Sequence, residues 1–120
     1  MNANDKIEFI RRCDPEGAAR LDRLFAKKDS LKEGNVYRER FTDRQFSLVF
    51  MPLVDAAFER AVILDILSNG DDTIPGISEK TNIGKDRVFE DIKELIKRNL
   101  VEMAGHKGRD AIFRKKRANG

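Results

Sequence analysis

The sequence predicts a mainly α-helical protein that ends in a small C-terminal β-hairpin. Apolar residues recur at helical spacing over most of the chain, and residues that favour helix starts precede several of these segments. Near the C-terminus, two short apolar segments flank a loop with a glycine close to each end. The chain has 120 residues, of which 40% are hydrophobic and 38% are charged, so it can form one modest core under a highly charged surface.

Two helices are predicted at the N-terminal end. The first covers Asp5–Cys13 and is weakly amphipathic. Asp14 then suits an N-cap and Pro15 suits the first helical position, so a second helix begins there and ends near Lys28. The apolar residues of this second helix share one face, and they are Ala18, Leu21, Leu24 and Phe25.

The next stretch is less regular. Residues 29–35 (DSLKEGN) are predicted to form a loop, and residues 36–41 (VYRERF) fit either a short strand or the start of a helix. Thr42 and Gln45 have the spacing of a capping box, in which each side chain satisfies a free backbone N–H of the first turn. We therefore expect a helix to begin at Asp43.

Pro52 lacks an N–H and clashes with the preceding turn, so a kink or break is expected near Phe50. A strongly periodic helix is then predicted over Leu53–Ser68, ending at Gly70, which is free to adopt a left-handed conformation. The broad apolar face of this helix comprises Leu53, Val54, Ala57, Phe58, Ala61, Val62 and Ile66. Two exposed aspartates are expected to follow, Asp71 and Asp72.

From Thr73 onward the sequence predicts two helices and the hairpin. Thr73 is expected to cap a helix over Ile74–Thr81, and residues 82–84 (NIG) form a tight turn with one buried apolar residue. A longer helix follows over Lys85–Asn99. Its inner face is predicted to carry Val88, Ile92, Leu95 and Ile96. The hairpin consists of strands at Leu100–Met103 and Ala111–Arg114 around a Gly105–Asp110 loop, and a basic, frayed tail is expected over Arg114–Gly120.

Two short helices joined by a turn that contains glycine form the helix-turn-helix arrangement. The stretch ISEKTNIGKDRVFEDIKELIKRNLVE, followed by GHKGRDAIFR, resembles the winged helix-turn-helix domains of bacterial and archaeal regulators of the broad MarR and IclR kind. Four apolar positions carry the resemblance, in the turn, early in the second helix and at the entry to the wing: Ile83, Val88, Leu100 and Val101. The resemblance covers about residues 55–116. It implies a winged domain over 53–116, preceded by a helical arm over 1–52 and followed by a basic tail over 117–120.

The charge distribution and the resemblance together predict binding to double-stranded DNA. Residues 1–83 carry 13 Lys/Arg and 15 Asp/Glu, whereas residues 84–120 carry 11 Lys/Arg and 6 Asp/Glu, so the positive charge is concentrated at the C-terminal end. The helix over about 85–99 would enter the major groove, and the wing over 105–110 would contact the backbone or the minor groove. The residues expected to contact DNA are Lys85, Arg87, Phe89, Glu90 and Lys93 in the helix and His106, Lys107, Arg109, Arg114, Lys115 and Lys116 in the hairpin and tail.

The expected groove-facing side of this helix departs from the family pattern. Family members often carry Ser, Thr, Arg or His there, whereas this chain has Phe89, Glu90 and Asp91, with Asp86 nearby. An acid can accept from a cytosine amino group, but three acids disfavour a polyanion. Alternative interpretations are therefore a winged helix that binds a protein as an adaptor, a replication or partition factor, or an RNA-binding protein.

The N-terminal helices suggest a dimerisation arm, because their apolar faces exceed what one small domain needs; alternatively, they complete the core of the winged domain. We expect a homodimer on a two-fold DNA site. The lone Cys13 excludes an intrachain disulfide, and together with the lone His106 it argues against a structural zinc site. With no catalytic motif, we expect no catalytic residue, metal or cofactor. The polar N-terminus and the lack of a long apolar run predict a cytoplasmic protein without membrane contact.

Overall fold

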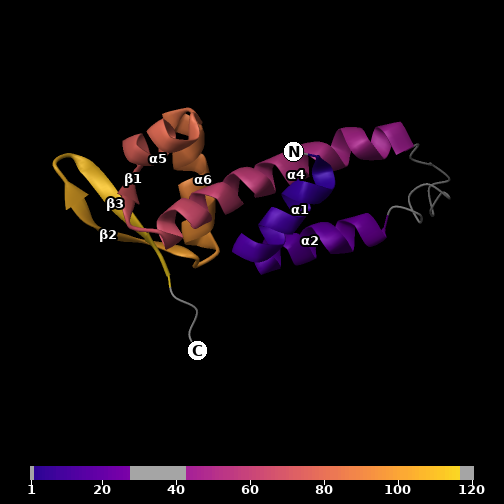
Figure 1. Cartoon of the computed structure of the whole chain (residues 1–120), viewed down its shortest axis with the longest axis horizontal. Coiled ribbons are helices and arrows are strands. Elements are labelled where there is room, and N and C mark those ends of the chain that lie inside the picture. The colour runs from indigo at the N-terminus through magenta and orange to yellow at the C-terminus, as the bar shows by residue number, and fades with distance from the viewer. Residues whose placement is uncertain (1, 28–42, 117–120) are drawn as a thin grey trace. The chain divides into compact units, whose positions relative to one another are not determined.

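A computed structural model describes residues 2–27 and 43–116, although only the backbone is described at Asp43 and Phe46 (Figure 1). These residues are mainly helical and include a small three-stranded antiparallel sheet near the C-terminus. The elements are α1 (Ala3–Cys13), α2 (Pro15–Ala26), α4 (Asp43–Ser68), β1 (Asp72–Thr73), α5 (Ile74–Thr81), α6 (Lys85–Lys97), β2 (Val101–Lys107) and β3 (Asp110–Lys115). The loop expected at 29–35, the ambiguous segment at 36–41, the Thr42 cap and the tail at 117–120 lie outside the described residues.

The chain divides into two compact units within α4, residues 1–58 and residues 59–120. Helix α4 therefore contributes its first part to one unit and its last part to the other. Within the described residues, no helix is both long enough and apolar enough to cross a membrane.

Local capping defines the first two helices. Helix α1 begins two residues earlier than predicted, because Asn2 and Asp5 form a capping box that the sequence analysis missed. The Asp5 N–H donates to Asn2 Oδ1 at 2.9 Å, and the Asn2 N–H donates to Asp5 Oδ2 at 3.4 Å. Helix α2 begins at Pro15 as predicted, and the Gly17 N–H donates to Asp14 Oδ1 at 3.1 Å. Both starts follow from satisfying backbone N–H groups that have no partner inside the helix.

A break of the helix near Phe50, one of the two outcomes predicted from Pro52, is wrong, because α4 continues through the proline. Packing on both sides of this position accounts for the continuity. The Phe50 ring packs on Phe25 of α2 with centroids 5.7 Å apart, and the Phe58 ring packs on Phe9 of α1 with centroids 5.2 Å apart. These contacts, before and after Pro52, offset the roughly 3 kcal/mol that an internal proline costs a helix.

Side-chain and backbone hydrogen bonds define α5 and the turn after it. As predicted, α5 covers Ile74–Thr81, and the Gly76 N–H donates to Thr73 Oγ1 at 3.1 Å. Asn82 ends the helix in a left-handed conformation with φ 61° and ψ 22°. The Ser78 hydroxyl then donates to the Ile83 carbonyl at 2.5 Å, which fixes the turn before α6.

The core of the C-terminal unit lies between α4, α5, α6 and the sheet. Its buried members are Ile63, Leu64, Leu67, Ile77, Val88, Ile92, Leu95, Val101 and Phe113. Ile83 packs against this core from the turn, as predicted. Two details differ from the prediction: α6 ends at Lys97 rather than Asn99, and Ile96 is exposed rather than on the inner face.

The sheet has the strand order β1–β3–β2, and its strand β1 was not predicted from the sequence. Asp72 and Thr73 of this strand pair with Phe113 and Ile112 of β3. Asp72 is half-buried rather than exposed, because its carboxylate accepts from the Thr73 N–H at 2.8 Å and from Lys80 Nζ at 2.7 Å. Gly70 does take a positive φ, but at 156° it is far from the left-handed helical value that was expected.

The hairpin is longer and its loop shorter than predicted. Strands β2 and β3 pair up to Lys107 and Asp110, so the turn consists of Gly108 and Arg109 rather than all of 105–110. Gly108 has φ 62°, as a two-residue turn with glycine in first place requires. Residues 114–116 were expected to fray, but the first two belong to β3, and the Lys116 N–H donates to the Leu100 carbonyl at 2.9 Å.

Replacing Thr73 with alanine is expected to destabilise the chain by about 1 kcal/mol, because the Gly76 N–H loses its cap. Urea denaturation followed by circular dichroism measures this loss. The Thr73→Ser variant keeps the accepting hydroxyl and is expected to stay close to wild type. Equal destabilisation of the two variants would contradict the assignment of the stabilising group to Oγ1.

Candidate nucleic-acid interface

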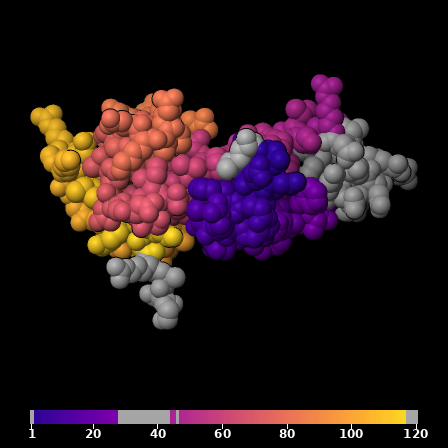
Figure 2. All heavy atoms as spheres, in the orientation of Figure 1, coloured from indigo at the N-terminus to yellow at the C-terminus, as the bar shows by residue number. Residues whose placement is uncertain are grey.

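The tip of the β2–β3 hairpin is a small basic protrusion. Lys107, Gly108 and Arg109 are all exposed, and His106 is exposed on the adjoining part of β2. The space-filling view shows the tip at the edge of the C-terminal unit, where its side chains meet solvent (Figure 2). The only acid next to the turn is Asp110, so the tip offers two cations for one anion. This composition suits contact with an anionic surface.

The start of α6 offers a second feature that suits an anion. Its N-cap is Gly84, and no side chain caps it, in contrast to the side-chain caps of α1, α2 and α5. A Cβ placed at Gly84 would have no atom within 4 Å, so the space outside this helix end is open. Lys85, the first helical residue, is exposed beside it. Free N–H groups, the helix dipole and a lysine thus act in the same direction on an approaching anion.

The outer face of α6 is mixed rather than uniformly basic. Lys93 forms an ion pair with Glu90 at 3.3 Å, and its ammonium lies 5.2 Å from the centroid of the Phe89 ring. Phe89 is 48% exposed, which confirms that this ring faces outward. Asp86 is also exposed, in the first turn of the helix. Two acids therefore remain on the outer side of α6.

The third acid does not face outward. Asp91 was expected on the groove-facing side, but it is buried, with 9% of its surface exposed. The reason is its helical phase: Val88, Asp91, Ile92 and Leu95 follow the spacing that places residues on one face, and the structure buries all four. The unfavourable charge that the sequence suggested on the outer face is thus reduced by one.

Asp91 belongs to a partly buried cluster of charges between α4 and α6. Arg87 donates to Glu59 Oε2 at 2.7 Å, and the exposed fractions of these two side chains are 70% and 14%. Burial first, then the hydrogen bond and charge of Glu59, raise the pKa of Asp91 to about 8, while the charges of Arg60 and Arg87 oppose the shift. Asp91 Oδ2 and Arg60 Nε are buried and make no hydrogen bond within the described residues.

This cluster was not identified by the sequence analysis. The spacing of Asp91 with Val88, Ile92 and Leu95 indicates that Asp91 faces the core, because these four positions share one face of a helix. Its partner Glu59 lies 32 positions earlier in the chain, and only the tertiary structure brings the two together. Arg87 remains at the surface, but its charge is partly used by Glu59.

The remaining basic residues of the predicted site belong to the sheet. Arg114 is exposed and forms a cross-strand ion pair with Glu102 at 3.5 Å. Lys115 and Lys116 are half-buried, and the Lys116 ammonium donates to the Asn99 side chain. The strongest cationic positions that the structure leaves open to solvent are therefore the start of α6 and the hairpin tip.

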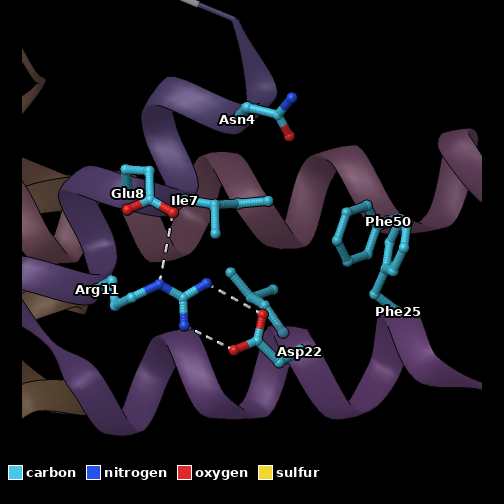
Figure 3. A pocket seen from close by; sticks show the side chains of 8 residues that line it. Asn4, Ile7, Glu8, Arg11, Asp22, Phe25 and Phe50 are labelled. Atoms are coloured by element: carbon cyan, nitrogen blue, oxygen red, sulfur yellow. Dashed lines mark hydrogen bonds and ion pairs between the residues drawn. The ribbon is translucent and has the colours of Figure 1, made fainter.

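The N-terminal unit contains a separate pocket of about 250 Å³ (Figure 3). One side of it is apolar and includes Ile7 and Phe50, and the other side carries a guanidinium with two carboxylates. Arg11 makes two hydrogen bonds with Asp22, at 2.8 and 3.3 Å, and a weaker ion pair with Glu8 at 3.6 Å. The pairing of Arg11 raises its own pKa and lowers the pKa of Asp22. These polar groups satisfy one another and hold α1 against α2.

No protein-family model, curated protein or solved structure matches the chain. The described part of the chain also contains no group of three or more His, Cys, Asp or Glu side chains that could hold a metal ion.

The buried carboxyl predicts an unusual pH dependence of stability. Because folding raises the pKa of Asp91 from 3.8 to about 8, the folded state binds more protons at this residue, and its contribution to stability falls as the pH rises from about 4 to about 8. Asp91→Asn removes this loss. Relative to wild type, the free energy of unfolding of the variant is expected to increase as the pH rises from about 4 to about 8, by at most about 1.4 kcal/mol per pH unit, because the wild-type carboxyl must take up a proton on folding.

Denaturant titrations at several pH values measure this gain. Glu90→Gln is the matched control, because it removes the neighbouring acid, which is exposed, and it is expected to leave the pH profile unchanged. A wild-type profile that runs parallel to that of Asp91→Asn would show that Asp91 ionises normally in the folded protein.

Proposed function

We propose that this chain is a winged helix-turn-helix protein that binds specific sequences of double-stranded DNA and acts as a regulator of transcription. Helix α6 enters the major groove, and the β2–β3 hairpin is the wing, which contacts the backbone or the minor groove. The observation that carries the proposal is the pair of open basic features in one unit, the uncapped start of α6 with Lys85 and the hairpin tip with Lys107 and Arg109.

The order of elements supports the same interpretation. Helix α5, a turn of three residues and α6 are followed directly by the hairpin, as the resemblance to winged helix-turn-helix domains implies. In this arrangement the N-terminal N–H groups of α6 meet a phosphate, and Lys85 adds a charge-assisted contact. The hairpin tip adds phosphate contacts through Lys107 and Arg109, which are exposed on a turn only two residues long. A short turn on paired strands holds these cations with little loss of conformational entropy on binding.

The burial of Asp91 makes this proposal more favourable than the sequence alone suggests. With that acid inside, the exposed charged residues of α6 include four cations, Lys85, Arg87, Lys93 and Lys97, and two anions, Asp86 and Glu90. Glu90 remains in position to accept from a cytosine amino group, and Phe89 remains in position to contact a thymine methyl. The outer face of α6 thus combines phosphate binding with base-specific groups.

An alternative function is an adaptor whose winged helix binds a protein. The exposed apolar residues favour it: Phe89 and Ile96 lie seven positions apart on the outer side of α6, at 48% and 43% exposure. That spacing forms a stripe along a helix, and apolar stripes of this kind bind other helices.

DNA binding predicts a steep salt dependence of affinity for random duplex DNA. Replacing Lys107 and Arg109 together with alanine is expected to lower the slope of log K against log salt by about 2, since each lost phosphate contact contributes about 0.9. Arg87→Ala is expected to lower it by less, because the guanidinium is already paired with Glu59. Fluorescence polarisation at several salt concentrations measures these slopes.

The matched control removes two cations from the N-terminal unit, Arg23 of α2 and its C-cap Lys27, by replacing both with alanine, and so causes the same change in net charge in the other unit. Its slope is expected to equal that of wild type. Binding that is undetectable even at low salt would favour the adaptor. An equal loss of affinity in the control and in the hairpin variant would show that binding depends on net charge and not on the hairpin.

A further inference from the structure

The N-terminal part of α4 is apolar on two opposite sides. One side is buried in the N-terminal unit, where Phe50, Val54 and Ala57 are 6%, 0% and 5% exposed. The other side carries four exposed apolar residues that we call the α4 stripe: Leu48, Val49, Pro52 and Leu53. Leu48 and Leu53 are 67% and 45% exposed. Their spacing of i, i+1, i+4 and i+5 keeps them on one face of the helix.

Such a stripe is costly in water for a chain that remains a monomer. Each large aliphatic side chain contributes about 1.5–3 kcal/mol when it passes from full exposure to full burial, and the two leucines and Val49 are all at least 45% exposed. The sequence gives no reason for apolar residues on this side, because polar residues have equal or better helix propensity. We infer that the α4 stripe is the surface on which a second copy of this chain docks, with the two α4 helices antiparallel.

Charges beside the stripe determine the direction of pairing. Arg44 and Asp55 are both exposed, and their separation of 11 residues, about three helical turns, places them on the same flank. In a two-fold antiparallel pair the same flank of each helix meets its equivalent, so Arg44 of one copy lies near Asp55 of the other, twice. Asp55 already accepts from Lys6 at 2.7 Å, but its side chain is still 52% exposed. A parallel pair would place neither charge beside an opposite one.

The side chains of the stripe are also complementary to themselves in this direction. With the two-fold axis between residues 50 and 51, Val49 of one copy lies level with Pro52 of the other at the centre of the contact. Leu48 and Leu53 are five residues apart and cover its two opposite edges. A contact confined to so few side chains buries less than the roughly 1,600 Å² of a standard interface, so we expect a dimer that forms at micromolar concentrations.

This inference deepens the proposed function by naming the partner, a second copy, that would give a two-fold protein for a two-fold DNA site. Only the role of the dimer, binding to a two-fold DNA site, rests on the proposed function. The experiments below measure association without DNA, so failure of either proposal can be recognised separately.

The first test is the mass of the full chain in solution, by light scattering after gel filtration, at tens of micromolar. Wild type is expected to have twice the mass of one chain, and the double variant Leu48→Glu and Leu53→Glu is expected to be monomeric with an unchanged circular dichroism spectrum. Met103→Glu is the control, because it places a charge at an apolar residue of β2 in the C-terminal unit that is 54% exposed, and it is expected to remain dimeric.

The second test measures direction by disulfide cross-linking in a Cys13→Ser background. Chains with Arg44→Cys and chains with Asp55→Cys are expected to cross-link when mixed, because these positions lie on the flank that meets its equivalent. Arg44→Cys alone is expected to cross-link poorly: two copies of residue 44 would be offset by about 20 Å along the helices, far beyond the roughly 7 Å that a disulfide spans between Cα atoms.

Three results would overturn the inference. A wild-type chain that is monomeric at this concentration would assign the stripe to another occupant. A Leu48→Glu and Leu53→Glu variant that stays dimeric would place the interface elsewhere. Efficient cross-linking of Arg44→Cys with itself would contradict the antiparallel direction.

Discussion

The burial of one face of α6 determines what the rest of this helix can contact. Val88, Ile92 and Leu95 are almost completely buried in the core of the C-terminal unit, and each contributes about 1.5–3 kcal/mol by leaving water. The helix therefore cannot rotate about its axis without exposing them. Phe89, Glu90 and Lys93 must then face outward, and Asp91 must face inward. The charge that α6 offers to a ligand is a consequence of this packing.

An acid in that inner face needs compensation from its neighbours. Helix α4 supplies Arg60, and α6 itself supplies Arg87, but Glu59 adds a second carboxylate, so the cluster contains two acids and two guanidiniums. Replacing such clusters by apolar residues often leaves stability unchanged or improves it, whereas removing a single partner is costly. The cluster is therefore better understood as fixing the position of α6 on α4 than as a large source of stability.

The sequence predicts an element well where neighbouring residues in the chain determine it, and poorly where distant residues do. Helix α5 was predicted to the residue, because Thr73, Pro75 and Asn82 act on their immediate neighbours. The break at Pro52 was wrong, because ring contacts with α1 and α2 stabilise the helix on both sides of it. Strand β1 is only two residues long and exists through pairing with β3, about 40 positions later, so no local pattern marks it. The inward position of Asp91 follows from helical phase and was predictable, whereas its meeting with Glu59 was not.

The charge cluster around Asp91 makes the proposed DNA binding depend on pH. The ion pair of Arg87 with Glu59 is weak, because the arginine side chain is 70% exposed to solvent. Exposed ion pairs contribute about 0–1 kcal/mol to stability. A phosphate near the start of α6 can therefore compete for Arg87. If Arg87 leaves, Glu59 and Asp91 remain close together with one cation fewer, and Glu59 is only 14% exposed. Loss of this cation raises the pKa of Asp91 further, so Asp91 holds its proton more readily. By linkage, the proposed DNA binding would strengthen as the pH falls through the pKa of Asp91, while Glu59 competes with a phosphate for Arg87.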